Sequence, residues 1–566
     1  MLVTICKLAR IMLQVKDMLP DLGQGFVIDC LKYYKLDPEA VVNAILEENL
    51  PPFLSDCDRS AAKSIEIKPP CSFDSEETST NCEYGRNIPS SEIFGSKMFK
   101  NDVREKIHCM SPLNLFYNKV KHSPQTHRDK RSLYFTDLLH PSLGNLESSL
   151  QINFMVDYEW LLLNYEVTSN LHKPLTIIYG EANELADKNS PLKSNIIAKR
   201  VKPRYPYGTH HTKMMVLVYD DSSVRVVVHT SNLIASDWEN RTQGLWVSPR
   251  CPKLENTTNS STRWESIGDS KTCFKRSLLR YLNFYEVSVL RPFTEKIKVC
   301  DFSSVNAFFV GSVPGSHVIS PSDPFQNWGH AFVAKILCKH NEHNKEMGYR
   351  DEESDIILQC SSIGSLGPNI EGSFLMELSA SLNATTLRST KKLPKWVRLV
   401  YPSKENVLNA YGGPLYGSGC LPYSQKTSDK QPWLNKVMCK WESDLINRTK
   451  AMPHIKTYTK LNGFCAHTKT DKERPKASYF ILTSANLSKS AWGSLNKTED
   501  KLFIQSYEAG ILLLPKFTHG ESHYSYSVTA ESVDKPAELV LPYDLPLTEH
   551  DSNDVPWVSE CLTDYI

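Results

Sequence analysis

Two sets of residues in this 566-residue chain share one pattern, a His-x-Lys followed at some distance by an Asn. Their members are His211, Lys213 and Asn232 in the first set and His454, Lys456 and Asn486 in the second. Neutral imidazoles can act as a nucleophile and as a general acid. Lysine and asparagine side chains can hold the oxygens of a phosphodiester. A single His-x-Lys is most often a solvated strand edge, but two matched copies predict phosphoryl transfer that requires no metal ion or cofactor.

The residues after the first His-x-Lys predict a β-hairpin that would position the set. Residues 214–219 are an apolar run with several β-branched members, residues 220–223 are a turn signal, and residues 224–229 predict a second strand. Residues 230–232 end that strand, and residues 233–238 are expected to begin a helix with Ser or Asn as its N-cap. Amide groups at such a helix start would add positive potential beside a bound phosphate. We therefore expect His, Lys and Asn to converge where the strands end.

Another His-x-Lys, His467-Thr468-Lys469, competes with His454 for the second catalytic position. Its distance to the downstream Asn, 19 residues, is closer to the 21 residues of the first set than the 32 residues counted from His454. Spacing therefore favours His467. The residues after Lys469 are charged and include a proline, which is incompatible with a buried central strand, whereas residues 455–459 alternate as a strand should. The strand pattern therefore favours His454, and we interpret residues 461–476 as an enlarged hairpin loop that carries His467.

These motifs and their surroundings resemble the tyrosyl-DNA phosphodiesterase family, a branch of the phospholipase D superfamily. The resemblance extends from about residue 112 to about residue 557, and its matching segments are residues 208–215, 229–234, 242–244, 361–367, 451–458, 483–489, 506–510 and 540–546. In that family the second His-x-Lys follows Met-Pro, as it does here at Met452-Pro453, which supports His454. Most phospholipase D enzymes carry an Asp five residues after the Lys, where this chain has Val218 and Leu461. This departure matches the tyrosyl-DNA branch and argues against a lipid phospholipase.

The resemblance implies an α/β fold, namely a duplicated phospholipase D-type α/β/α sandwich whose site lies on a pseudo-twofold axis. The implied reaction hydrolyses a 3′-phosphotyrosyl linkage, above all a topoisomerase I remnant, and related 3′ DNA adducts, and it leaves a 3′-phosphate. His211 would form a phosphohistidine intermediate, and His454 would protonate the leaving group and then activate water. Each histidine needs a partner at its second nitrogen, and the resemblance implies Gln243 and Glu508 for these roles. Residues 503–514, which contain Glu508, are expected to form one strand.

The resemblance also implies contacts with the substrate. Phe154, Tyr207, Ser362, Ser365 and Trp557 are implied on the DNA side, and Pro422 is implied on the peptide side. Serine hydroxyls and nearby amides can donate to phosphates, and aromatic rings can stack on bases. Without the resemblance, each of these aromatic residues would more readily be assigned to the core.

The N-terminal region, residues 1–56, predicts three short helices and resembles a CUE domain, a small ubiquitin-binding fold of helices only. Asp37-Pro38 is typical of a helix start, with Asp as N-cap and Pro at the first position. The family's ubiquitin-binding surface maps to Met18, Leu19, Pro20, Ile45 and Leu46. The alternative is a packing bundle in which these apolar residues all belong to the core.

Composition separates this bundle from the catalytic region. Residues 57–105 are rich in Ser, Glu, Thr, Asn and Pro and are expected to be a disordered linker. Residues 106–303 and 304–566 are the expected first and second catalytic halves. A net charge of +1 means that any DNA-binding surface must be a local patch. Fifteen cysteines without a Cys-x-x-Cys pair favour reduced intracellular thiols, and the absence of an apolar run near about 18 residues predicts no membrane span.

These observations favour a nuclear DNA repair enzyme, with a cytoplasmic pool left open and a monomeric catalytic region. Its expected partners are single- or double-stranded DNA with 3′ adducts, the topoisomerase I-derived peptide as substrate, and ubiquitin. A nearer alternative is a broader 3′ end-cleaning nuclease of the same superfamily. A rival from another class is a ubiquitin-binding adaptor with a vestigial catalytic region. The six intact His, Lys and Asn residues argue against the rival.

Overall fold

The computed structural model describes most of the chain after residue 102. The described ranges are 103–181, 194–255, 267–340, 354–383, 397–462, 476–526, 538–551 and 553–565, together with five residues nearer the N-terminus. The chain divides into two compact units, residues 1–98 and residues 99–566. Within the described ranges, no helix combines the length and the apolar character that crossing a membrane requires.

The N-terminal unit is described through five helical residues with buried side chains, Phe26, Cys30, Val41, Ala44 and Ile45. Ile45 is only 7% exposed, so its assignment to a ubiquitin-binding surface is wrong. Its side chain belongs to the interior of this unit, as the packing-bundle alternative predicts. The other residues expected to bind ubiquitin, Met18, Leu19, Pro20 and Leu46, lie outside the described residues.

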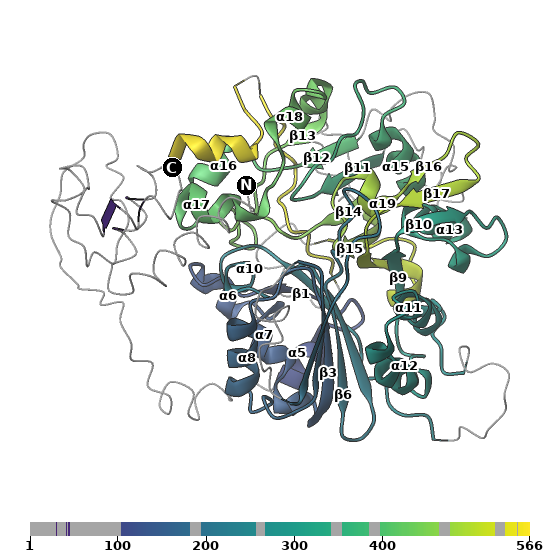
Figure 1. Cartoon of the computed structure of the whole chain (residues 1–566). Coiled ribbons are helices and arrows are strands. Elements are labelled where there is room, and N and C mark those ends of the chain that lie inside the picture. The colour runs from purple at the N-terminus through teal and green to yellow at the C-terminus, as the bar shows by residue number, and fades with distance from the viewer. Residues whose placement is uncertain are drawn as a thin grey trace. The chain divides into compact units, whose positions relative to one another are not determined.

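The larger unit contains two large sheets (Figure 1). They have the same strand order, except that the first has one further strand, β2 (Ser132–Leu133), at its edge. The first sheet runs β5 (Ile196–Arg200), β4 (Leu175–Tyr179), β3 (Leu146–Ile152), β6 (Met214–Tyr219), β7 (Val224–His229), β8 (Gly244–Val247), β1 (Leu115–Asn118) and β2 (Ser132–Leu133). The second runs β13 (Met438–Cys439), β12 (Val397–Val400), β11 (Ser354–Gln359), β14 (Thr457–Asn462), β15 (Lys476–Thr483), β18 (Glu508–Leu513) and β9 (Ala307–Ser312). A smaller sheet joins β10 (Gly315–Val318), β17 (Lys501–Ile504) and β16 (Ser494–Leu495).

The two large sheets also match in the direction of each pairing. The pairs β3–β4 and β4–β5 are parallel, as are β11–β12 and β12–β13. The hairpins β6–β7 and β14–β15 are antiparallel, and each lies beside an antiparallel neighbour, β3 or β11. One strand order with one set of directions is the duplication that the repeated motif predicts, so the α/β class with pseudo-twofold symmetry is confirmed.

Helices cover the sheets (Figure 1). Those in the first part are α5 (Val103–Cys109), α6 (Pro124–Arg128), α7 (Phe135–Leu138), α8 (Tyr158–Val167), α10 (Ala235–Glu239), α11 (Phe274–Asn283) and α12 (Arg291–Lys298). Those in the second are α13 (Gly329–His340), α15 (Phe374–Leu382), α16 (Lys404–Leu408), α17 (Gly413–Gly417), α18 (Gln425–Ser428), α19 (Lys489–Trp492) and α20 (Pro515–Thr518). Short 3-10 helices are η2 (Pro141–Leu143), η3 (Ser288–Leu290), η4 (Pro324–Gln326), η6 (Ser418–Cys420), η7 (Pro432–Val437) and η8 (Ser559–Tyr565).

The apolar cores of the two halves are in contact with each other. Helices α5, α7 and α8 share one buried apolar core with β6, β7 and β8. On α11, the ring of Phe274 lies 5.2 Å from Trp246 of the first sheet and 5.8 Å from Phe309 of the second, measured between ring centroids. A Cβ at Gly244 would lie 2.5 Å from Leu482 and 2.6 Å from Ile455. The halves therefore pack closely, and position 244 has no room for a side chain.

The predicted hairpin is confirmed, because β6 and β7 coincide with the expected runs 214–219 and 224–229. Every residue of both strands is buried, including Arg225 and His229 of β7, so burial is continuous along the strands and does not alternate. The strand expected after His454 is present as β14. Residues 463–475 of the expected enlarged loop, which include His467, lie outside the described residues.

Three expected boundaries differ from the structure. Helix α10 starts at Ala235 and has Ile234 as its N-cap without a side-chain hydrogen bond, so neither Ser231 nor Asn232 caps it. The single strand expected from residue 503 to residue 514 is two strands, β17 and β18, in different sheets. Helix α5 begins at Val103, inside the expected linker, because Val103 and Ile107 bury their side chains in the first core.

Candidate active site

Each His-x-Lys segment pairs through its backbone with the opposite half. The amide of His211 donates to the carbonyl of Tyr507 at 3.0 Å, and the amide of Tyr507 donates to Thr209 at 2.9 Å. In the same way the amide of His454 donates to the carbonyl of Thr242 at 3.0 Å. Tyr507 and Thr242 immediately precede Glu508 and Gln243. Each histidine is therefore held next to the partner that the other half supplies.

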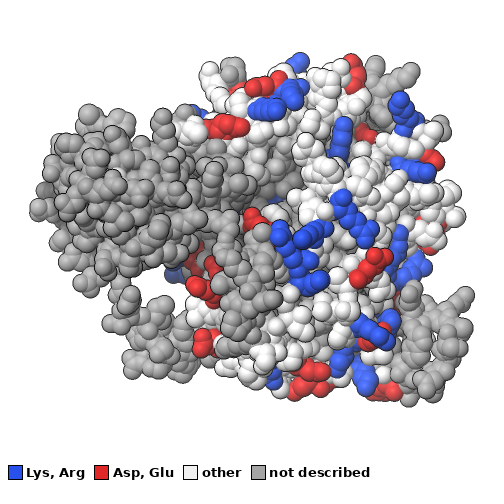
Figure 2. All heavy atoms as spheres, viewed as in Figure 1, with Lys and Arg blue, Asp and Glu red and all other residues white. Residues whose placement is uncertain are grey.

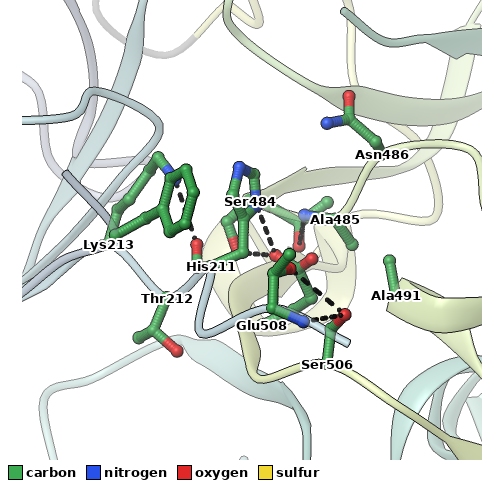
Figure 3. A network of polar contacts seen from close by, with 12 residues as sticks. His211, Thr212, Lys213, Ser484, Ala485, Asn486, Ala491, Ser506 and Glu508 are labelled. Atoms are coloured by element: carbon green, nitrogen blue, oxygen red, sulfur yellow. Dashed lines mark hydrogen bonds and ion pairs between the residues drawn. The ribbon is translucent and has the colours of Figure 1, made fainter. Parts of the chain in front are cut away.

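His211 is bound to a buried carboxylate (Figure 3). Its Nδ1 lies 3.0 Å from Oε2 of Glu508, which also accepts from the hydroxyl of Ser484 at 2.5 Å. Because a carboxylate only accepts, Nδ1 carries the proton and Nε2 carries the lone pair. Burial alone would raise the pKa of Glu508, but His211, Ser484 and Lys213 outweigh it and hold the pKa below its ordinary value. This arrangement orients a neutral imidazole for attack.

His454 has two partners at its Nδ1. Gln243 Nε2 lies 3.1 Å away, and Oδ2 of Asp237 lies 3.0 Å away. Asp237 is fully buried, forms an ion pair with Arg241, and accepts from the backbone amide of Asn232 at 2.6 Å. Burial would raise the pKa of Asp237, but His454 and Arg241 outweigh it and keep the carboxyl ionised. Sequence reasoning assigned no role to Asp237.

The signal for Asp237 was present but ambiguous. Asp237-Trp238 follows the first Asn, and Ala491-Trp492 follows the second. The repeated residue in these two pairs is the tryptophan. Asp237 has no acidic counterpart in the second pair, so the repeat does not mark it as functional. By its place in the sequence, five residues after the Asn, Ala491 is the counterpart of Asp237.

The two lysines of the motifs are buried, and each contacts the backbone of its own histidine. Lys213 Nζ donates to the carbonyl of His211 at 3.1 Å, and Lys456 Nζ donates to the carbonyl of His454. Both side chains are fully buried. Burial, with the charge of Lys456, lowers the pKa of Lys213 to about 7, and burial lowers the pKa of Lys456 to about 8. An anion between them would stabilise both ammonium groups.

Asn486 is fixed by its carbonyl oxygen. Oδ1 accepts from the amide and the hydroxyl of Ser361 at 3.1 and 3.2 Å and from the amide of Ser362 at 3.1 Å. Its amino group is thereby directed away from these donors and remains available to a substrate oxygen. Because the amide of Ser362 is used to hold Asn486, it cannot also be the expected donor to a DNA phosphate, and only its hydroxyl retains that role.

The expected substrate contacts are not equally accessible. The centroid of the Phe154 ring lies 5.6 Å from that of the His211 ring. Ser365 and Pro422 are exposed, and Ser362 is half-buried. Trp557 is 0% exposed, so its expected role in stacking on bases is wrong. The reason is local: Trp557 donates its backbone amide to Pro402 at 2.9 Å, and Pro556 pairs with Ser403, which turns the indole into the core.

Tyr207 is presented to solvent by a rigid segment. It is 91% exposed and adopts a left-handed backbone with φ of 62°. On either side, the carbonyl of Pro206 accepts from Gln505 at 2.7 Å and the amide of Thr209 donates to Ser506 at 3.0 Å. A strained conformation held by such contacts is typical of functional positions. These contacts fix the backbone on both sides of Tyr207 and leave its ring exposed.

A basic segment that sequence reasoning did not single out leads into Tyr207. Lys199, Arg200, Lys202 and Arg204 lie within six residues at the end of β5 and just beyond it. Lys199 and Lys202 are exposed and form no ion pair with any described residue. Figure 2 shows Lys and Arg side chains gathered near the middle of one face, so positive charge is local although the chain is nearly neutral.

Comparison with known proteins identifies the catalytic region. Residues 114–551 match the model of the tyrosyl-DNA phosphodiesterase family. Tyrosyl-DNA phosphodiesterase 1 of Drosophila melanogaster is 40% identical over 468 residues, which cover 82% of this chain and 76% of that protein. The crystal structure of a yeast tyrosyl-DNA phosphodiesterase superposes with a TM-score of 0.56 at 18% identity, covering 78% of this chain and 99% of the other. At this identity the superposition supports the duplicated fold only.

The N-terminal unit matches a different family. Residues 10–49 match the model of the CUE domain. Human activating signal cointegrator 1 complex subunit 2 is 55% identical over 56 residues, which cover 10% of this chain and 7% of that protein. The likeness is thus restricted to one small domain.

Proposed function

Because this chain belongs to the tyrosyl-DNA phosphodiesterase family, we propose that its site removes tyrosyl residues, such as a topoisomerase I remnant, from DNA 3′ ends. The chain is a metal-independent DNA repair phosphodiesterase, and the proposal concerns its substrate and intermediate. The observation that carries it is that each histidine binds, through Nδ1, a buried acceptor from the opposite half. With Nδ1 so engaged, Nε2 is the ring nitrogen of each imidazole that acts on the phosphodiester in the proposed reaction.

In the first step, Nε2 of His211 attacks phosphorus and the P–N bond forms as the bond to the tyrosyl oxygen breaks. Glu508 stabilises the imidazolium character that develops on His211. His454 donates its Nε2 proton to the leaving phenolate. The products are a free tyrosyl peptide and a DNA strand linked through its 3′-phosphate to His211.

In the second step, His454 returns as a general base. It removes a proton from water, the water oxygen bonds to phosphorus, and the P–N bond to His211 breaks. DNA leaves with a 3′-phosphate and His454 is again protonated. The same group thus acts as acid and then as base, which two successive displacements at one phosphorus require.

Lys213, Lys456, Asn232 and Asn486 hold the non-bridging oxygens in both steps. Burial, Asp237 and the lysine charges act together on His454, and their net effect lowers its pKa well below the ordinary value. A phosphodiester anion bound between the two lysines offsets their charge and favours protonated His454. Substrate binding therefore charges the general acid.

The test is incubation of the full chain with an oligonucleotide carrying a 3′-phosphotyrosine in EDTA. Release of a strand ending in 3′-phosphate is the expected result, and the His211→Ala variant is the matched control. Conversion of the tyrosyl strand to a 3′-hydroxyl, or degradation of an unmodified strand at the same rate, would favour the end-cleaning nuclease. No turnover of any 3′ adduct would favour the adaptor with a vestigial site.

For the N-terminal unit we propose ubiquitin binding, supported by the match of residues 10–49 to the CUE domain. A nuclear site of action is proposed because the substrate is DNA. Cell fractionation with an antibody against the chain tests the location, and a protein found only outside the nucleus would contradict it.

A further inference from the structure

His454 has two partners at one ring nitrogen that require opposite protonation states. Asp237 Oδ2, 3.0 Å from Nδ1, can only accept, so it requires a proton on Nδ1. Gln243 Nε2, 3.1 Å from the same atom, can only donate, so it requires a bare Nδ1. The two contacts cannot both be hydrogen bonds in one protonation state.

The orientation of the Gln243 amide is determined by its neighbours. Oε1 accepts from the hydroxyl of Thr230 at 2.7 Å, and that hydroxyl is itself the acceptor of the Gly244 amide at 3.0 Å. On the other side, Nε2 donates to the backbone carbonyl of Asp237 at 3.2 Å. A flipped amide would lose these contacts, so Nε2 is the atom that faces His454.

We propose that Asp237 is a positioning residue that holds the proton on Nδ1 of His454 during the second step of the proposed reaction, whereas Gln243 serves the opposite tautomer. The inference rests on the proposed function. In the imidazolium, Nδ1–H is donated to Asp237. After Nε2 has given its proton to the phenolate, the same bond keeps the remaining proton on Nδ1. The Nε2 lone pair then faces the attacking water and accepts its proton.

The surroundings of Asp237 suit this role. The carboxylate is 0% exposed and is paired with Arg241, four residues later in the chain. The carbonyl of Arg241 accepts from Asn118 at 2.7 Å, and a Cβ at Gly419 would lie 2.4 Å from its guanidinium. The ion pair is therefore enclosed, and Asp237 remains ionised beside His454.

The two histidines differ in the way that their roles require. His211, the nucleophile, attacks through Nε2 and needs one tautomer, and Glu508 is the one side chain among the described residues that holds its Nδ1. His454, the acid and base, gains and loses its proton at Nε2 while Nδ1 must keep its own, and it has the buried carboxylate of Asp237 beside Nδ1 in addition to the Gln243 amide. The position equivalent to Asp237 in the other half is Ala491, so the fold does not impose the second carboxylate.

The test is Asp237→Asn in the full chain, with rapid-quench measurement of covalent adduct on an oligonucleotide with a 3′-p-nitrophenyl phosphate. This leaving group needs little protonation, so adduct formation should fall by less than about tenfold, while adduct hydrolysis should slow by about 100-fold, the lower range of general-base effects. The adduct therefore accumulates. Asp221→Asn, an exposed acid paired with Arg250, is the matched control and should leave both rates unchanged.

The ratio of the two rates does not depend on the folded fraction, because unfolded protein contributes to neither step. An unchanged ratio in Asp237→Asn would overturn the proposal even if the variant is unstable. Gln243→Glu in the Asp237→Asn background returns a carboxylate to Nδ1 and should restore adduct hydrolysis by at least about tenfold. Failure of this rescue would also count against the proposal. If wild type itself formed no adduct, the proposed function would fail instead.

Discussion

The backbone amide of His211 donates to the carbonyl of Tyr507 at 3.0 Å, across the boundary between the two halves. This bond places the first histidine beside Glu508, the residue after Tyr507. The corresponding bond from His454 to Thr242 places the second histidine beside Gln243. Neither half can therefore orient its own histidine, and the site exists only where the halves meet.

The first prediction separates the roles of the two histidines. His211→Ala should form no adduct and show no turnover, because it lacks the nucleophile. His454→Ala should still load a 3′-phosphotyrosyl strand slowly, since a phenolate leaves without full protonation, but it should hydrolyse the adduct poorly. Denaturing gels before and after acid treatment would reveal an acid-labile protein–DNA band in His454→Ala. An equal band from His211→Ala would reverse the assignment.

The second prediction concerns the competing motif. His467→Ala should retain turnover within a few-fold of wild type, because we expect His467 to lie outside the catalytic set and to contribute little to transition-state binding. Lys456→Ala should lose about 2.7–4 kcal/mol of transition-state stabilisation, by analogy with removal of one preorganised oxyanion donor. Steady-state kcat/KM on the tyrosyl oligonucleotide provides the comparison. Inactive His467→Ala together with active His454→Ala would show that spacing was the better guide.

The site could be predicted from the sequence where residues able to act on a phosphate lay next to a recognisable strand pattern. The hairpin after Lys213 was predictable because continuous apolar runs and a polar turn have few alternatives. Asp237 was missed because a single acid after a strand carries no periodic signal, and its partners are 4 residues away at Arg241 and far along the chain at His454. Trp557 was misassigned because sequence cannot show which side of a segment is buried.

The third prediction concerns the N-terminal unit. With Ile45 buried, any ubiquitin-binding patch must be formed by other residues, with Met18, Leu19, Pro20 and Leu46 as the remaining candidates. A small patch supports weak binding, so a Kd in the micromolar range or weaker is expected, about −8 kcal/mol at most. NMR titration of labelled ubiquitin with the full chain and with a chain starting at Phe99 would test this. Equal shifts from both proteins would place the interaction outside the CUE unit.

The fourth prediction concerns the basic segment before Tyr207. If Lys202 contacts a phosphate of a single-stranded substrate, Lys202→Gln should reduce the slope of log(1/KM) against log salt by about 0.7, the value for one phosphate. The maximal rate should not change, since Lys202 lies outside the paired motifs. Lys173→Gln is the control. Lys173 precedes β4, whereas Gly180 follows the other end of that strand, where an added Cβ would lie 2.7 Å from the backbone oxygen of His210, so Lys173 is at the end of β4 away from the site. Equal slopes in all three proteins would exclude Lys202 from the DNA path.

The last prediction concerns the pH dependence of stability. His229 is fully buried, and burial, together with Lys213, lowers its pKa to about 3. The folded protein therefore keeps this imidazole neutral, while the unfolded chain binds a proton below about pH 6.5. The contribution of neutral His229 to the free energy of unfolding is fully present above that pH, and it is lost as the pH falls toward the pKa of the folded state. Between pH 7 and pH 5 this one group should cost about 2 kcal/mol of unfolding free energy.

His229→Leu should remove that loss, so urea unfolding at the two pH values should show a smaller decrease than in wild type. His172→Leu, at an exposed position, should follow the wild-type pH dependence and is the matched control. Because the comparison is between two pH values within each protein, a change in packing caused by the leucine cancels. A decrease in His229→Leu as large as in wild type would mean that the imidazole is already protonated in the folded protein.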